Sequence, residues 1–301
     1  MNLSKADLEH LHQLACHTAN QAGEIIRQYS AKQVQVEHKD GGDSLAAQVV
    51  TEVDRHCQTI IVEALSPSLS QFDLALLSEE AADDRQRLVK EYFWCIDPLD
   101  GTLAFTQSKP GYAVSIALVS RSGEPVMGVI HEPITQTTYS AFKGAGAYRN
   151  QSPWSPPSQN KNTNNSTLTL PVDQSFCARE DADRILKQLA HAAQKSGLKG
   201  LDIRHHGGAV MNAIQVLDNA PGLYFKLPKP TQGGGSLWDF AATACVFQEA
   251  GAIACDFTGN PLDLNREDST FMNHRGAVFA SHPEILTLLR ASGFPGDRLP
   301  K

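Results

Sequence analysis

The chain has 301 residues, of which 41% are hydrophobic and 20% charged, and it carries a formal net charge of −7. This is an ordinary globular composition, and the chain is long enough to bury a full core. The negative balance provides no basic surface for a nucleic-acid polymer and no polybasic patch for a membrane. We therefore expect neither as a partner.

The cysteines and the apolar residues are distributed as in a cytoplasmic protein. Six cysteines occur without a C-x-x-C pair, and several lie inside apolar runs. This pattern is typical of free, buried thiols in a reducing compartment. The N-terminal residues alternate between apolar and charged types, unlike a signal peptide, and no stretch approaches the roughly 18 apolar residues of a membrane span. We expect a cytoplasmic location.

The first half of the chain predicts two helices followed by a run of strands. Residues 4–29 carry apolar side chains at spacings of three and four, which is typical of an amphipathic helix, and a second helix is expected from about Thr51. Five strand candidates follow, namely DLALLSEE, EYFWCID, GYAVSIALVS, EPVMGVIHEP and TTYSAFKG. We expect the second of them to end at Pro98, because proline lacks a backbone donor. Helices followed by strands are typical of an α+β layer.

The second half predicts alternating strands and helices after a polar segment. Residues 151–167 are rich in Pro, Ser and Asn, so we expect a loop or linker there and two domains, 1–165 and 166–301. The expected elements beyond it are the strand LTLPV, a helix over 179–196, the strand LDIRHH, a helix over 209–217, the strand GLYFKL, a helix from near Trp238, the strands AIACDFTG and AVFAS, and the helix PEILTLLRAS.

The strongest chemical signal is the hexapeptide DPLDGT at residues 97–102, which follows an apolar strand. Asp97 and Asp100 are expected to project from a tight turn. Gly101 and Thr102 are expected to begin a short helix whose free N–H groups can hold an anion. Hard divalent cations take oxygen ligands, and Mg²⁺ is typically shared between carboxylates and substrate phosphate. The alternative is an acidic turn with a capping aspartate.

Three further acids accompany this motif, each with a simpler interpretation beside the functional one. Glu79 ends a strand candidate and is chosen over Glu80 as the inward-pointing acid, although acids at strand ends are mostly solvated. Asp54 lies in the first turn of the second helix, where the helix dipole alone favours an acid. The functional interpretation has Asp54 accept a hydrogen bond from Thr102. Asp239 is also in a first turn, and as a ligand it would bring a carboxylate from the second half of the chain.

Together these motifs resemble the inositol monophosphatase family of lithium-sensitive phosphatases. The matching segments are VTEVD, EE, DPLDGT and WD, and also YAVSIALV, GVIHEP, FKGAGAYRN and EAGAIACDFTGNPLD, so the resemblance covers roughly residues 35–285. It implies an α+β or α/β fold, a layered α-β-α-β-α sandwich of the type shared with fructose-1,6-bisphosphatase. It also implies an enzyme, a phosphomonoesterase that depends on two to three Mg²⁺ ions.

By that resemblance, the first Mg²⁺ would be held by Glu79, Asp97 and the Leu99 carbonyl. The second would be held by Asp97, Asp100 and Asp239, and a third more loosely through Glu79 and waters. The ions would neutralise and orient the phosphate and activate a water for in-line attack.

The resemblance also assigns residues to the phosphate and to the water. Gly101 and Thr102 would contact the phosphate, while Glu79 and Thr102, with Asp54 behind Thr102, would position and deprotonate the water. No covalent phosphoenzyme is implied. LDGTL also resembles the haloacid-dehalogenase signature, but Pro98 stands where that family has its nucleophilic aspartate, which excludes that mechanism.

The segment before Trp238 bears on the substrate. It carries Lys226 at the position where the Y-x-E pattern of inositol monophosphatases would place its acid, and Lys229 follows just beyond. A lysine facing the pocket suits a second phosphate group. YFKLP and PLDLNREDSTFMN are similar to segments of bacterial 3′(2′),5′-bisphosphate nucleotidases, so 3′-phosphoadenosine 5′-phosphate is the favoured substrate. The alternatives are an inositol monophosphatase or a sugar phosphatase, with both lysines as solvated loop charges.

Two departures from the family pattern and one alternative class complete the expectations. Residues 39–50 are longer than the corresponding nucleotidase segment, and Asp43 is a candidate for the loop of the third metal. The GGGS insertion before Trp238 is unusual and is expected to reshape the pocket. A non-catalytic nucleotide-binding relative would usually have lost an acid, whereas this chain retains each one expected. The resemblance leads us to expect a homodimer.

Overall fold

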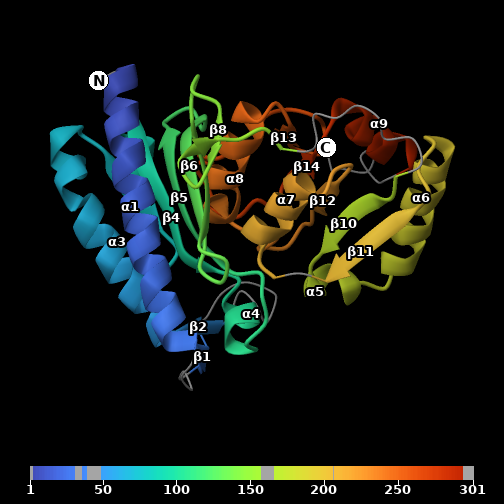
Figure 1. The fold of residues 1–301 in the computed structure, drawn as a ribbon, viewed down its shortest axis with the longest axis horizontal. Coiled ribbons are helices and arrows are strands. Elements are labelled where there is room, and N and C mark those ends of the chain that lie inside the picture. The colour runs from blue at the N-terminus through green and yellow to red at the C-terminus, as the bar shows by residue number, and fades with distance from the viewer. Residues whose placement is uncertain (1–2, 31–35, 39–48, 157–165, 206, 294–301) are drawn as a thin grey trace.

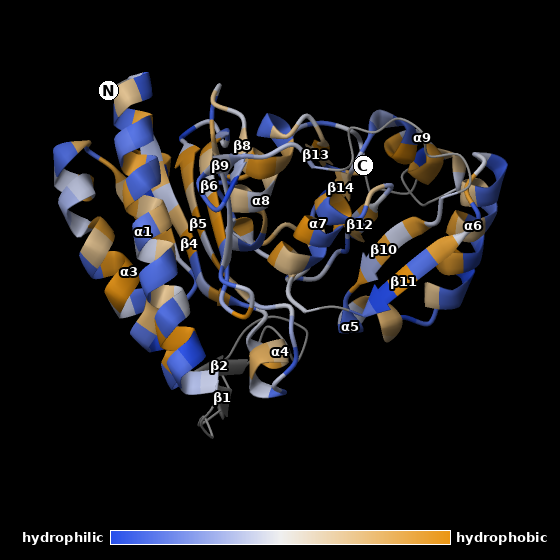
Figure 2. Cartoon of the chain, in the orientation of Figure 1, coloured by the Kyte–Doolittle hydropathy of each residue, from blue (hydrophilic) through white to orange (hydrophobic). Residues whose placement is uncertain are grey.

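The structure is a computed structural model that describes residues 3–30, 36–38, 49–156, 166–205 and 207–293. Its elements form five successive layers, which are helices, a large sheet, helices, small sheets and helices (Figure 1). This is the α-β-α-β-α sandwich expected from the sequence. The strands of the large sheet are mostly hydrophobic, while the outer helices mix hydrophilic and hydrophobic residues (Figure 2).

Two long helices form the first layer, and both were predicted. α1 (Lys5–Ser30) and α3 (Glu52–Gln71) pack on one face of the large sheet. The apolar stripe of α1, spaced by three and four residues, is fully buried in Leu11, Ala15 and Ala19. The short strands β1 (Val36–His38) and β2 (Val49–Thr51) pair antiparallel just before α3.

The large sheet has seven strands in sequence order. They are β3 (Ala75–Ser78), β4 (Tyr92–Asp100), β5 (Ala113–Ser120), β6 (Pro125–Glu132), β7 (Thr137–Phe142), β8 (Ala147–Arg149) and β9 (Ser152–Pro153). β3 runs parallel to β4, and the other neighbours are antiparallel. Helices cover both faces, which explains why the central strands are continuous apolar runs rather than alternating ones. β8 and β9 were not predicted, and β9 lies within the expected linker.

The predicted end of the second strand at Pro98 was wrong. β4 continues to Asp100, and its register against β5 shifts between Asp97, which pairs with Ser115, and Asp100, which pairs with Ala113. Proline is tolerated in a strand where the ladder is interrupted, because no donor is needed there. The irregularity also redirects side chains, which decides where the two aspartates point.

The second half supplies the remaining layers. The inner helices are α7 (Ala209–Asp218) and α8 (Leu237–Glu249), and the outer ones are α6 (Ala182–Lys195) and α9 (Pro283–Ala291). Between them lie the parallel pair β10 (Leu168–Val172) and β11 (Leu201–His205), and the antiparallel sheet β12 (Leu223–Lys226), β14 (Ala277–Ala280) and β13 (Ile253–Cys255). Short helical segments complete the fold, namely η1 (Gln86–Leu88), α4 (Thr102–Thr106) and α5 (Gln174–Cys177).

One hydrophobic cluster connects the large sheet with the second half of the chain. It includes Phe93 of β4, Ile214 of α7 and Phe247 of α8, each fully buried. The expected domain boundary after residue 165 adjoins residues 157–165, which are outside the described residues, so the division stays a prediction. All six cysteines are free thiols. In the described ranges, no helix combines the length and the apolarity that a bilayer crossing requires.

Candidate active site

Three carboxylates from two distant parts of the chain meet at the end of β4. Asp97 and Asp100 come from β4 and Asp239 from the first turn of α8. Each offers one oxygen, and these oxygens lie within 4.8 Å of one another. Asp97 and Asp100 are only 1% and 5% exposed. The structure thus brings together three of the four acids predicted to converge, and their role as metal ligands stays a prediction.

Glu79 stands next to this cluster because β3 runs parallel to β4. Its backbone N–H donates to the Ile96 carbonyl at 3.1 Å, directly before Asp97 in sequence. Its negative charge is close enough to raise the pKa of Asp97 and of Asp100. Glu79 lies outside the group of oxygens within 4.8 Å, so its place as a metal ligand stays a prediction.

The cluster carries more negative charge than its buried surroundings favour. Burial raises the pKa of Asp97 well above its usual range, and the neighbouring charges of Glu79, Asp100 and Asp239 raise it further. Burial likewise raises the pKa of Asp100, followed by the charge of Asp239. A hard cation that prefers oxygen ligands would remove this repulsion. The donor set and its burial therefore fit a divalent metal ion.

Backbone N–H groups orient two of the acids. The Leu99 N–H donates to Asp97 Oδ1 at 2.9 Å. Both oxygens of Asp100 accept N–H groups from the first turn of α7, from Ala209 at 3.1 Å and Val210 at 2.9 Å. Such hydrogen bonds fix carboxylates at a helix N-terminus. Sequence reasoning missed the contact with α7, although the Gly-Gly pair that precedes this apolar helix is a usable signal.

Gly208 keeps this contact open, which gives a first testable prediction. A Cβ atom at Gly208 would lie 2.2 Å from Asp100 Oδ2. Gly208→Ala is expected to displace the carboxylate and to lower any metal-dependent activity of the cluster about 10- to 100-fold, as changes around metal ligands typically do. The divalent-metal concentration needed for half-maximal activity should rise, as a titration would measure.

Gly144→Ala is a control for backbone strain away from the cluster. Its φ of 76° disfavours alanine, but its added Cβ meets no atom within 4 Å. It should leave the metal requirement unchanged. If Gly208→Ala kept the wild-type metal requirement, the proposed effect on Asp100 would be refuted.

Asp239 caps α8 and also belongs to the acidic cluster, while its role as a metal ligand stays a prediction. Its Oδ2 accepts the Ser236 N–H at 2.6 Å, which caps α8, while its carboxylate also belongs to the acidic cluster. The GGGS insertion shapes this cap. Gly235 has φ 83°, and a Cβ there would lie 2.5 Å from the Phe240 ring and 2.9 Å from Asp239 Oδ2. The insertion therefore supports the position of a cluster acid.

Thr102 and Asp54 form the predicted hydrogen bond. Thr102 Oγ1 lies 2.9 Å from Asp54 Oδ1 and 3.0 Å from the Leu99 carbonyl oxygen, and it can donate its one proton to either. Gly101, with φ 86°, begins α4 as expected and places Thr102 beside the cluster. Asp54 is 2% exposed, so its carboxylate is held in place by α3 and is not a solvated acid of the helix terminus.

Lys226 is not a solvated loop charge. It ends β12, its side chain is 18% exposed, and its Nζ lies 2.9 Å from Asp173 Oδ2. Although burial lowers the pKa of Lys226, the charges of Asp173, Asp239 and Asp100 raise it overall. The ammonium group is therefore a stable cation close to the acidic cluster, and sequence reasoning missed its partner.

The predicted roles of Lys229 and Asp43 are not tested by the structure. The Lys229 backbone exchanges hydrogen bonds with Asn273, and its side chain is partly buried, so its substrate role stays a prediction. Asp43 lies outside the described residues. The Leu99 carbonyl lies in the same turn as Asp97, and its role as a metal ligand also stays a prediction.

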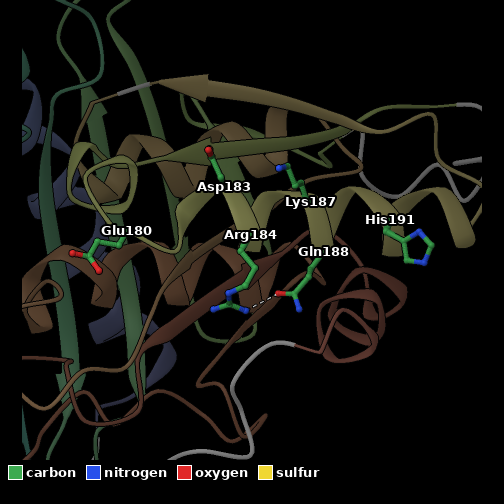
Figure 3. A pocket seen from close by; sticks show the side chains of 6 residues that line it. All are labelled: Glu180, Asp183, Arg184, Lys187, Gln188 and His191. Carbon is green, nitrogen blue, oxygen red and sulfur yellow. Dashed lines mark hydrogen bonds between the residues drawn. The ribbon is translucent and has the colours of Figure 1, made fainter.

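A surface groove of 560 Å³ lies elsewhere, along α6 (Figure 3). Its lining is Glu180, Asp183, Arg184, Lys187, Gln188 and His191. Arg184 bonds to Gln188 at 3.0 Å, and the charges are of both signs. None of the cluster acids lines this groove, and one helix supplies nearly all of it. We therefore place the chemistry at the acidic cluster.

Fold and cluster together define the class of this protein. A layered sandwich with buried acids at the end of its main sheet fits a phosphatase that uses metal ions. The chain belongs to the inositol monophosphatase family, since the model of that family matches residues 7–292.

Its similarity to individual relatives extends over most of the chain. Inositol monophosphatase 3 of Solanum lycopersicum is 30% identical over 252 residues, which are 83% of this chain and 87% of that protein. The 3′(2′),5′-bisphosphate nucleotidase CysQ of Aggregatibacter actinomycetemcomitans is 31% identical over 271 residues, which are 88% of this chain and 90% of that protein. Inositol monophosphatase-II from Staphylococcus aureus has the same fold, with a TM-score of 0.72 at 20% identity, and the match covers 97% of this chain and 99% of that one.

Proposed function

We propose that this protein is a Mg²⁺-dependent phosphomonoesterase that converts 3′-phosphoadenosine 5′-phosphate into AMP and phosphate. The observation that carries this proposal is the Lys226 ammonium group, held in the same buried region as the acidic cluster. A doubly phosphorylated substrate needs one phosphate at the cluster and a cation for the other. The inositol monophosphatase and the bisphosphate nucleotidase compared above are 30% and 31% identical to this chain, so overall sequence identity does not select the substrate.

The cluster acids define where the reacting phosphate binds. Asp97, Asp100 and Asp239, together with Glu79, would hold the metal ions, which when bound neutralise the phosphate charge and lower the pKa of a water. Glu79 is the proposed base for the attacking water. The backbone N–H groups of Gly101 and Thr102 are proposed to contact the phosphate.

Thr102 connects Asp54 to this site. When the Thr102 hydroxyl donates its proton to Asp54 rather than to the Leu99 carbonyl, the lone pairs of its oxygen remain available to accept a hydrogen bond from water. We propose that the Asp54–Thr102 pair orients the attacking water in this way, while Glu79 takes its proton.

A side-by-side assay tests the substrate. Phosphate release from 3′-phosphoadenosine 5′-phosphate and from inositol 1-phosphate is measured with Mg²⁺ and with EDTA. We expect kcat/KM to favour the nucleotide, and Lys226→Met to lower kcat/KM for the nucleotide about 10- to 100-fold, the contribution of one charged hydrogen bond. Preference for the inositol ester, unaffected by Lys226→Met, would contradict the proposal. Binding of either ester without phosphate release would favour a non-catalytic relative.

We also propose a cytoplasmic location and a homodimeric assembly. The six free thiols favour a cytoplasmic protein. A homodimer is expected from the family resemblance, and size-exclusion chromatography with light scattering would test it.

A further inference from the structure

Asp173 is a buried acid that the site described above does not include. It follows β10, is 9% exposed and accepts hydrogen bonds from three side chains. Asn212 Nδ2 lies 3.0 Å from its Oδ1, the Tyr224 hydroxyl 3.2 Å from its Oδ1, and Lys226 Nζ 2.9 Å from its Oδ2. A carboxylate with this many donors is firmly fixed.

The three donors connect Asp173 to the acidic cluster through two elements. Asn212 lies on α7, one turn beyond the N–H groups that hold Asp100. Tyr224 and Lys226 are two apart on β12 and therefore point to the same face of the strand. Tyr224 is fully buried, and burial, followed by the charges of Asp173 and Asp100, raises its pKa. The hydroxyl therefore stays protonated and donates to Asp173.

Lys226 keeps hydrogen-bonding capacity in this arrangement. An ammonium group has three N–H donors, and within the described part of the chain its hydrogen-bonding partner is Asp173. A free lysine side chain samples many rotamers, and fixing it in advance removes that cost from ligand binding. The pair thus presents a preorganised cation with donors to spare.

We propose that Asp173 is a positioning residue for substrate specificity, holding Lys226 so that it binds the phosphate that is not hydrolysed. This inference rests on the proposed function. Asp173 acts through Lys226 and does not touch the reacting phosphate. It should therefore affect recognition of the second phosphate and leave hydrolysis of a singly phosphorylated substrate nearly intact.

The test is a double-mutant cycle that compares 3′-phosphoadenosine 5′-phosphate with 3′-AMP, which lacks the 5′-phosphate. The quantity measured is the ratio of their kcat/KM values. Asp173→Asn and Lys226→Met should each lower this ratio about tenfold, and the double variant should lower it no further. Lys226→Arg should retain most of the ratio, and kcat/KM for 3′-AMP should change less than about threefold.

Asp181→Asn is the matched control, because Asp181 pairs with Arg179 and Arg184 at the surface of the second half and should leave the ratio unchanged. Equal losses on both substrates, or additive effects in the double variant, would reduce Asp173 to a structural role and overturn the inference. If the wild-type kcat/KM ratio of the two substrates is high and Asp173→Asn leaves it unchanged, the inference is also overturned.

A wild-type ratio near one would instead refute the proposed substrate, and the inference with it. Should Asp173→Asn fail to fold, Tyr224→Phe removes one donor to Asp173 and should lower the ratio about threefold. An unchanged ratio in a folded Tyr224→Phe protein would overturn the inference.

Discussion

Replacing Asp97 by asparagine is expected to lower kcat for phosphate release by about a thousandfold. Asp97 lies at the centre of the cluster, since the charges of Glu79, Asp100 and Asp239 all act on it. Asparagine has nearly the same shape and can still accept the Leu99 N–H through Oδ1. The change therefore removes one charge from the metal-binding group, and the loss of several kcal/mol of transition-state stabilisation corresponds to about three factors of ten.

Phosphate release across a range of Mg²⁺ concentrations measures this effect. Asp73→Asn is a matched control, because Asp73 is exposed and its positive φ of 52° suits asparagine equally well. It should retain full activity. An Asp97→Asn enzyme with more than a tenth of wild-type activity and an unaltered Mg²⁺ requirement would exclude Asp97 as a metal ligand.

The order of the helices and main strands could be predicted because the signals are local. The apolar spacing of three and four residues identified α1, and apolar runs together with the turn signals between them identified β4 to β7. The end of β4 was mispredicted because proline occurs both where a strand ends and where the hydrogen-bonded ladder inside a strand is interrupted. Only the pairing of Asp100 with Ala113 distinguishes these two cases here, and that pairing depends on the neighbouring strand β5.

The site likewise divides into parts that local sequence motifs predict and parts that depend on contacts far along the chain. Asp97, Asp100 and Asp239 lie in recognisable motifs, and the Thr102–Asp54 bond followed from them. Asp173 was missed because its three partners come from α7 and β12, far along the chain. An acid that directly follows the apolar strand LTLPV resembles Glu79 after β3, so the position of Asp173 was a signal that could have been used.

Without metal, Asp97→Asn should be more stable than the wild-type protein at neutral pH. Two carboxylate charges separated by 4.8 Å repel by about 3 kcal/mol at an effective dielectric constant of roughly 20. Removing one such repulsion should raise Tm by about 5 °C in a chain of this size. The same substitution that inactivates the enzyme is therefore expected to stabilise its metal-free form.

The sign of the pH dependence follows from the raised pKa of Asp97. The native carboxyl holds its proton at pH values where the unfolded one, with a pKa near 3.9, has lost it. The native state then binds more protons than the unfolded state, so wild-type stability falls as pH rises above about 4. The Tm difference between Asp97→Asn and wild type should be small near pH 4 and should grow toward pH 8.

Thermal unfolding in EDTA between pH 4 and pH 8 measures this difference, and comparing the two proteins at each pH cancels the titration of groups that do not interact with Asp97. Saturating Mg²⁺ at pH 8 should reverse the order, because a bound cation removes the repulsion in the wild-type protein and binds the variant poorly. A Tm difference that is independent of both pH and Mg²⁺ would mean that Asp97 is not confined with other negative charges. The acidic cluster would then lack the electrostatic reason to bind a metal ion that we infer from its burial.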